Sequence, residues 1–418
     1  MPSNPGRWYV ARQAGVALLT ANAIRPLNTP RTAIPAFAAG WLTSELAPQL
    51  LALTAVDTLA SAGRRRAPAA GVALAAASAA GLGWVVRRAG ASATVVEASL
   101  REGIGEDYRE VLETPVDPAD LRPPLRRLAR PFRFADPAVE VIRDISYTEG
   151  GRRARLDVYR PRDGDLADAP VLVQVHGGAW TIGRKEEQGL LLMNRMAARG
   201  WVCVALNYRL APRHRWPAQI VDVKKAIAWV REHVAEYGGD PAYVAITGGS
   251  AGGHLAALAA LTPDVKQFQP GFEDADTSVV ACVPFYGVYD MAGDDGDPYA
   301  VGLRDGLLAR KVFSSDPAQD LDEYRQASPL HQVTEDAPDF LVFHGANDTL
   351  VSVRQARAFV AELRRRSRAS VTYAELPSAQ HAFEIFGSIR SHHVIRAAAR
   401  WLEWHHATWR AARDRQAS

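Results

Sequence analysis

The chain has 418 residues, of which 48% are hydrophobic and 23% are charged, and its formal net charge is +3. These values are ordinary for a folded protein and exclude wholesale disorder. The arginines are scattered among acidic residues and form no basic stripe, which argues against nucleic-acid binding. The chain is longer than one typical α/β domain of about 250–300 residues, so an additional segment is predicted.

Two long apolar stretches occur near the N-terminus. Residues 67–86 are uncharged and flanked by arginines, and as a helix they would be ~30 Å long, the hydrocarbon thickness of a bilayer. Residues 33–59 are also long enough, but they include Glu45 and Asp57, and a carboxylate near mid-membrane costs about 3 kcal/mol. We interpret residues 33–88 as a helical hairpin that attaches the protein to a membrane of the cell envelope. The alternative is a pair of alanine-rich helices packed on a cytoplasmic catalytic domain or in a dimer.

The domain organisation predicted from these patterns has three parts. Residues 1–100 form the hydrophobic helical region, and residues 101–138 form a linker rich in proline and arginine, with a short helix near 125–129. Residues 139–410 form the catalytic domain. If the first part is only an anchor, a chain that begins at Arg101 should be soluble and active.

From residue 139 onward, strands alternate with helices. Two alternating segments predict an opening antiparallel hairpin, and the continuous apolar runs that follow predict strands buried on both faces of a parallel sheet. Both cysteines, Cys203 and Cys282, lie inside such runs and are interpreted as core residues. This alternation predicts an open, doubly wound α/β sheet, in which ligands bind at the carboxyl ends of the strands. The predicted strands are 139–147, 154–159, 171–175, 201–206, 243–247, 279–285, 340–343 and 370–376, and the predicted helices are 187–198, 218–236, 251–261, 353–366 and 391–406.

The most specific motif is the G-x-S-x-G sequence around Ser250, between a predicted strand and a predicted helix. In this context the serine is a nucleophile held at a strained backbone angle, and the neighbouring glycines allow the chain to pass close to it. A second motif, His176-Gly177-Gly178-Ala179-Trp180, follows the strand at 171–175. We expect the backbone N–H groups of Gly177, Gly178 and Ala251 to bind the oxyanion of a tetrahedral intermediate. We expect His176 to hold this loop by hydrogen bonds.

A serine nucleophile needs a base and an acid that orients the base, in the chain order Ser, Asp or Glu, His. Asp348 follows the predicted strand at 340–343, and His381 follows the last predicted strand. We therefore predict a triad of Ser250, Asp348 and His381. His344 precedes the acid in the chain, which is the wrong order for the base.

These motifs in this order resemble the hormone-sensitive-lipase-like branch of the α/β-hydrolase esterases, including actinobacterial acyl-esterases with an N-terminal hydrophobic extension. The segment Tyr208-Arg209-Leu210-Ala211-Pro212 is similar to a segment of that family, and we expect Arg209 to pair with Asp222 behind the site. Two positions depart from the family pattern. Gly249 stands where the family commonly has aspartate before the serine, and the oxyanion loop has two glycines where the family has three.

The resemblance implies the α/β-hydrolase fold, a serine carboxylesterase or lipase acting on small-molecule or lipid esters of short to medium acyl chain, and no metal or organic cofactor. Two alternatives stay open. Similar motif variants occur in arylformamidase-like enzymes, which would make the substrate an amide, and a retired hydrolase fold would make the chain a membrane-anchored binding protein. Trp180 and Tyr286 are candidate walls of the acyl pocket. Residues 286–325 form a long insertion that is a candidate lid.

Overall fold

The structure is a computed structural model that describes residues 5–417 except residues 28, 30, 124 and 295. Eight strands form one sheet in the order β1-β2-β4-β3-β5-β6-β7-β8. The hairpin strands β1 and β2 are antiparallel to each other, β2 is antiparallel to β4, and all later pairs are parallel. This is the predicted α/β-hydrolase architecture. The strands are β1 (Val139–Ser146), β2 (Arg155–Pro161), β3 (Ala169–Val175), β4 (Val202–Leu206), β5 (Gly239–Gly249), β6 (Ala281–Phe285), β7 (Asp339–Gly345) and β8 (Val371–Leu376).

Helices cover both faces of this sheet, because the side chains of the central strands are apolar on both faces. α7, α8 and α11 share one core cluster with the sheet, whereas α6, α12 and the end of α4 share the cluster on the opposite face. Both cysteines are free and buried, as expected. The helices of this part are α6 (Leu190–Ala197), α7 (Ala218–His233), α8 (Ala251–Leu261), α9 (Pro298–Leu303), α10 (Leu321–Gln326), α11 (Val353–Arg366) and α12 (Ile389–Ala417).

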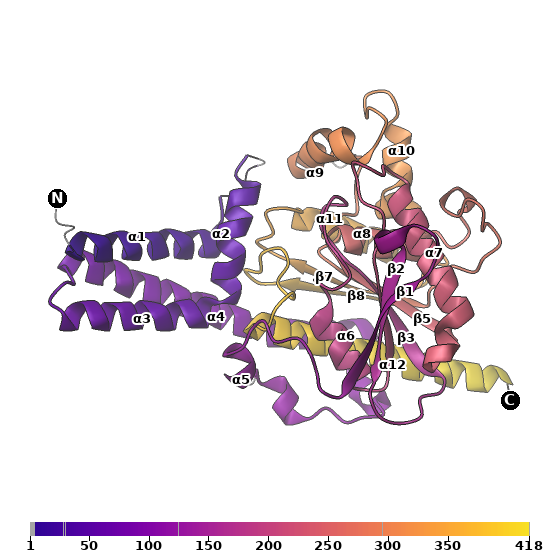
Figure 1. Cartoon of the computed structure of the whole chain (residues 1–418), viewed down its shortest axis with the longest axis horizontal. Coiled ribbons are helices and arrows are strands. Elements are labelled where there is room, and N and C mark those ends of the chain that lie inside the picture. Colours follow the sequence, from indigo (N-terminus) through magenta and orange to yellow (C-terminus); the bar gives the residue numbers. More distant parts are fainter. Residues whose placement is uncertain (1–4, 28, 30, 124, 295, 418) are drawn as a thin grey trace.

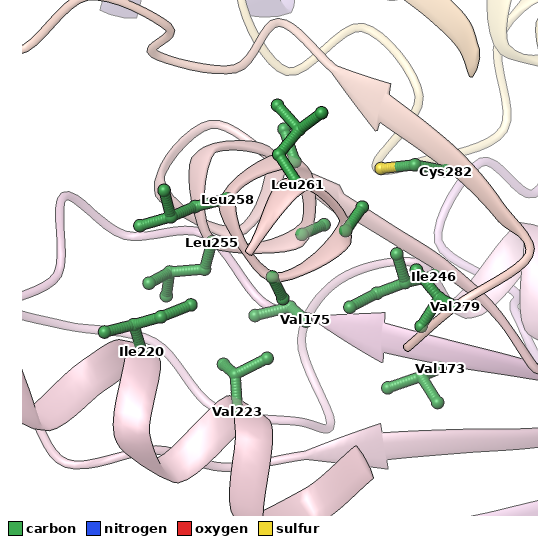
Figure 2. Close-up of a cluster of buried hydrophobic side chains, with 14 of the residues drawn as sticks. Val173, Val175, Ile220, Val223, Ile246, Leu255, Leu258, Leu261, Val279 and Cys282 are labelled. Atoms are coloured by element: carbon green, nitrogen blue, oxygen red, sulfur yellow. The ribbon is translucent and has the colours of Figure 1, made fainter. Parts of the chain in front are cut away.

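Helix α8 is the most enclosed helix near the predicted nucleophile. Figure 2 shows Leu255 of α8 next to Ile220 of α7, with Leu258 beside it and the strand residues Val175 and Ile246 on the other side of the helix. Every residue of α8 is buried. The sheet and α7 therefore hold the N-terminus of α8, which directly follows Ser250, in a fixed position.

The N-terminal region has four helices (Figure 1). Three of them project from the catalytic part as an arm, and the second of the four lies between this arm and the catalytic part. The helices are α1 (Pro5–Ile24), α2 (Ala33–Glu45), α3 (Ala47–Gly63) and α4 (Ala69–Ile104). We call α1, α3 and residues 69–86 of α4 the N-terminal arm. α2 lies across the base of the arm against the catalytic part, and the second half of α4 packs on α12 and β8.

The helices α3 and α4 form a hairpin around residues 64–66, as predicted, but the first predicted helix is shorter than expected. Residues 33–59 do not form one membrane-length helix, because the chain turns at Leu46 between α2 and α3. Glu45 is buried in an ion pair with Arg390 of α12, so α2 faces the catalytic part. Among the described residues, only α4 is both long and apolar enough to cross a membrane.

The predicted linker runs along the catalytic part between the arm and β1. It contains two short 3₁₀ helices, η1 (Tyr108–Val111) and η2 (Pro118–Leu121), and the helical turn α5 (Leu125–Leu128). The turn lies where the sequence predicted a short helix. A hydrogen bond of 2.7 Å from Gln49 Nε2 to the carbonyl oxygen of Leu128 ties α5 to the first turn of α3.

Candidate active site

The predicted nucleophile lies at a sharp bend between β5 and α8. Ser250 has φ 58° and ψ −121°, a strained combination for a residue other than glycine. The glycines around it are required sterically: a Cβ on Gly252 would lie 2.2 Å from the carbonyl oxygen of Val175, and one on Gly248 would lie 2.5 Å from Gly252. The hydrogen bond of 3.0 Å from Ser250 N to the oxygen of Phe285 fixes the bend on the next strand.

The predicted acid and base are in direct contact. His381 Nδ1 lies 2.6 Å from Asp348 Oδ2, and both side chains are buried. Because the carboxylate accepts, Nδ1 carries the proton and Nε2 of a neutral ring has a free lone pair. Burial alone would raise the pKa of Asp348, but His381 and His344 outweigh it and hold the pKa well below the usual range.

Two further contacts fix this pair. The other carboxylate oxygen of Asp348 accepts from the N–H groups of Leu350 and Val351, each at 2.9 Å. Gln380 Oε1 accepts from Thr349 N at 2.8 Å and from His381 N at 2.9 Å, so one amide joins the acid loop to the histidine loop. The carboxylate is thus held as an anion in one orientation.

His344, the rejected candidate base, lies beside the acid rather than opposite the serine. Its Nε2 is 3.0 Å from the carbonyl oxygen of Val351 and 3.4 Å from Asp348 Oδ2. His344 therefore supports the acid.

Tyr286 connects the serine bend to the histidine. Its ring centroid is 4.4 Å from that of His381, and a Cβ on Gly249 would lie 2.7 Å from its hydroxyl oxygen. The hydroxyl donates to Glu384, whose carboxylate oxygens are both 2.5 Å away. Tyr286 thus occupies the space beside residue 249, which gives a steric reason for glycine there. It is 1% exposed, so it supports the histidine and is not the expected pocket wall.

Ser250 reaches the same edge of the sheet as Asp348 and His381, because β5, β7 and β8 are parallel and each precedes one of them. Within the described residues, no hydrogen bond joins the Ser250 hydroxyl to His381. This contact is often long in enzymes without bound substrate.

The predicted oxyanion loop lies beside the bend, with one difference from expectation. A Cβ on Gly177 would lie 3.2 Å from Ser250 Cβ, which places the loop next to the nucleophile. The N–H of Gly177, however, donates to Gln188 Oε1 at 2.7 Å and is already occupied. The N–H groups of Gly178 and Ala251 form no hydrogen bond with any described residue and are free to bind an oxyanion.

The residues behind this loop are structural. His176 Nδ1 bonds to Gly177 O at 2.7 Å, its ring stacks on Tyr208, and burial lowers its pKa to about 4, so it stays neutral. As expected, Arg209 pairs with Asp222. Trp180 is 1% exposed and donates to His254 Nδ1 at 3.1 Å in the core, so it does not form the expected pocket wall.

The candidate lid packs against the start of α7. It contains α9, the π-helix η6 (Arg304–Val312) and α10, and Trp216 donates its backbone N–H to Val312 O at 2.8 Å. The ring of Trp216 lies 5.6 Å from that of Phe313.

Helix α2 contributes residues that sequence reasoning missed. The ring of Phe37 meets that of His381 edge-on at 5.9 Å, and the indole of Trp41 donates to the carbonyl oxygen of Ala382 at 2.8 Å. A Cβ on Gly40 would lie 3.5 Å from Gln380 Nε2. These three positions of α2 form one helical face, which covers the histidine loop.

Comparison with known proteins agrees with this geometry. Residues 156–363 match the BD-FAE family. The chain is 43% identical to the "Probable carboxylic ester hydrolase LipM" of Mycobacterium tuberculosis, over 97% of this chain and 96% of that protein. It is also 43% identical to esterase LipQ of the same organism, over 77% of this chain and 76% of LipQ. The likeness to LipM therefore includes the N-terminal arm.

Two solved esterase structures resemble about two thirds of this chain. Esterase 2 of Thermogutta terrifontis, phosphoramylated by tabun, matches with a TM-score of 0.52 and 27% identity, over 64% of this chain and 94% of that chain. Its butyrate-bound form matches with a TM-score of 0.51. On fold, motif order and these similarities, the chain belongs to the hormone-sensitive-lipase-like family of α/β-hydrolase carboxylic ester hydrolases.

Proposed function

We propose that this enzyme hydrolyses carboxylic esters of short to medium acyl chain through an acyl-enzyme on Ser250. The observation that carries the proposal is the His381–Asp348 pair, with 2.6 Å between Nδ1 and Oδ2, at the sheet edge where β5 delivers Ser250. The names of the relatives, carboxylic ester hydrolase and esterase, favour an ester over the amide alternative. The butyrate held by a structural neighbour supports a modest acyl length.

The proposed reaction has two steps. In the first, Ser250 Oγ attacks the ester carbonyl carbon and its proton passes to His381 Nε2, while Asp348 stabilises the imidazolium. The N–H groups of Gly178 and Ala251 bind the tetrahedral oxyanion, and α8 begins at Ala251, so the positive end of its dipole faces that charge. The imidazolium then protonates the leaving alkoxide as the ester C–O bond breaks. In the second, water attacks the acyl-enzyme by the same route and releases the acid.

An acyl-length series of p-nitrophenyl esters tests this proposal. We expect highest kcat/KM for chains of about two to eight carbons, and a loss of at least about 10³-fold for Ser250→Ala and for His381→Gln. His344→Gln should lose much less, because His344 contacts the acid and the carbonyl oxygen of Val351 and takes no proton from the serine. A matched anilide should be cleaved far more slowly than the ester. Full activity of folded Ser250→Ala, or no labelling of the wild type by a fluorophosphonate, would refute the mechanism.

We also propose that the N-terminal arm attaches the enzyme to a membrane of the cell envelope. Only 28% of the most apolar window of α4 is buried, unlike a core helix such as α8. Large apolar side chains are exposed along the arm, with Leu18 at 73%, Leu53 at 65% and Leu59 at 73%. α1 has 20 residues and would be ~30 Å long, the length of a bilayer core, but among the described helices only α4 is also apolar enough to cross one.

One group of polar side chains in the arm pairs across α1 and α3. Arg12 Nη2 lies 2.7 Å from Asp57 Oδ1, and Gln13 Nε2 donates to Asp57 Oδ2 at 2.8 Å, so the carboxylate of Asp57 has partners within the arm. The turn at the far end of the arm carries Arg64, Arg65 and Arg66.

Flotation with neutral phosphatidylcholine vesicles tests the attachment. The full-length enzyme should float with the vesicles and stay bound in high salt, because the contact is apolar. A variant with Leu18, Leu53 and Leu59 changed to serine should float less. Leu261→Ser changes a leucine that is buried in the catalytic part, so it leaves the exposed leucines of the arm in place and serves as the control. Wild-type enzyme that remains in the soluble fraction would contradict the proposal.

A further inference from the structure

A cavity of about 720 Å³ opens between the α5 segment and α6, away from the candidate active site. Arginines dominate its lining, and Asp136 is its one carboxylate among the described lining residues. The arginines are Arg126, Arg127, Arg130, Arg133, Arg195 and Arg199. We call this the arginine cavity. Its strong positive charge differs from the rest of the catalytic part, where most arginines lie beside carboxylates.

Four of these arginines have no counter-ion in the described part of the chain. Arg199 pairs with Glu403, but Arg126, Arg127, Arg130 and Arg133 form no ion pair with any described residue. Guanidinium groups that line one opening and are not paired with a carboxylate repel one another, and an anion with several oxygens would relieve the repulsion. Phosphate esters supply such oxygens in the geometry that arginine binds.

The arginine cavity lies at the base of the N-terminal arm. Gln49 of α3 bonds to Leu128 of α5, and the ring of Phe132 lies 5.4 Å from that of Phe386, which contacts Trp41 of α2. The same segment exposes two large apolar side chains, Leu125 at 82% and Phe132 at 62%. Exposed apolar side chains between arginines are typical of segments that lie in a membrane interface.

We propose that the arginine cavity binds the phosphate headgroup of anionic phospholipids, at the bilayer surface where the arm enters. The choice of a lipid over a free anion rests on the proposed membrane attachment. Leu125 and Phe132 would enter the interface beside the headgroup. Each arginine near an anionic surface strengthens binding roughly fivefold, so three of them would contribute on the order of 100-fold.

Calorimetry on the full-length enzyme in a non-ionic detergent tests the site. The probes are dihexanoyl phosphatidylglycerol, dihexanoyl phosphatidylcholine and inorganic phosphate, with both lipids below their micellar concentrations. The wild type should bind the phosphatidylglycerol at least about tenfold more tightly than either other probe. The variant with Arg126, Arg130 and Arg133 changed to glutamine should lose at least about tenfold in that affinity.

A charge-matched control changes Arg213, Arg310 and Arg354 to glutamine, three exposed arginines of the catalytic part outside the cavity. It should bind phosphatidylglycerol like the wild type. Fluorophosphonate titration and circular dichroism of both triple variants show that they are folded, and the single variant Arg130→Glu repeats the test with one change. The proposal would be overturned if the wild type bound the two lipids equally or bound inorganic phosphate as tightly as phosphatidylglycerol. It would also be overturned if the cavity variant bound phosphatidylglycerol as tightly as the wild type. The flotation experiment uses neutral vesicles and does not depend on these arginines. It therefore tests the membrane attachment separately from the headgroup site, which the calorimetry tests.

Discussion

The indole Nε1–H of Trp41 donates a 2.8 Å hydrogen bond to the carbonyl oxygen of Ala382, the residue after His381. The two residues are 341 positions apart in the chain. Trp41 also stacks on Phe37, whose ring meets the imidazole of His381. The N-terminal region therefore takes part in building the candidate active site, and it is more than an attachment device.

Trp41→Phe should lower kcat by roughly two- to tenfold with a smaller change in KM. The substitution keeps an aromatic ring beside Phe37 but removes the donor to Ala382, and one such hydrogen bond contributes about 0.5–1.5 kcal/mol. Steady-state kinetics with a p-nitrophenyl ester measures the change. Trp8→Phe, in the first turns of α1 at the far end of the arm, is the control and should behave like the wild type. Equal kcat for Trp41→Phe and the wild type would show that α2 does not position the histidine.

A chain that begins at Arg101 should be insoluble or much less stable than the full-length enzyme, contrary to the expectation from sequence. It would lack α2 above His381, and it would expose the face of the sheet and of α12 that Val96 and Leu100 of α4 now cover. It would also uncover β8, an edge strand that could pair with another molecule. Sedimentation and fluorophosphonate labelling measure the result. A soluble chain that labels fully would restore the simple-anchor interpretation.

The sequence was sufficient for the parts of the site that depend on local patterns. The bend at Ser250 needs glycines at fixed offsets, and the order of strands places Asp348 and His381 at one edge, so both could be predicted from motif and order. Contacts between distant segments leave no local signal. In the sequence Glu45 is only a charge that opposes membrane insertion, because its partner, Arg390, lies 345 residues away. The hydrogen bond from Gly177 to Gln188 joins residues only 11 positions apart, but it depends on how the loop between β3 and α6 folds, which the sequence pattern does not predict.

Glu45→Gln should lower the free energy of unfolding by about 3 kcal/mol or more. Glu45 and Arg390 form a fully buried ion pair, and Ser388 Oγ donates to Glu45 Oε2 at 2.7 Å. Removing one charge leaves the other buried without a counter-ion, which typically costs about 3–5 kcal/mol. Denaturant unfolding followed by tryptophan fluorescence measures the loss. The double variant Glu45→Gln/Arg390→Gln removes both charges and should recover part of the lost stability. If its loss equals the sum of the losses in Glu45→Gln and Arg390→Gln, the two residues are not coupled.

Glu384→Gln should remove one contribution to stability that the wild-type enzyme loses as the pH rises. Burial raises the pKa of Glu384 to about 7, and the hydrogen bond from Tyr286 offsets this only in part. Since the folded-state pKa lies above the unfolded value, the protonated form favours folding. This contribution is fully present below about pH 4.5 and is lost as the pH rises through 7.

Between pH 5 and pH 8 the free energy of unfolding of the wild type should fall by at most about 3 kcal/mol relative to that of Glu384→Gln. The difference between the two curves isolates Glu384, because buried histidines such as His176, whose pKa is lowered to about 4, titrate alike in both proteins. Urea unfolding at several pH values measures both curves. Glu362→Gln is the control, because Arg365 lowers the pKa of Glu362 and this group titrates below the window. The control should therefore follow the wild-type curve. If Glu384→Gln keeps the wild-type slope, Glu384 is already ionised at pH 5, and the contact between Tyr286 and Glu384 joins a neutral phenol to a buried carboxylate throughout the range.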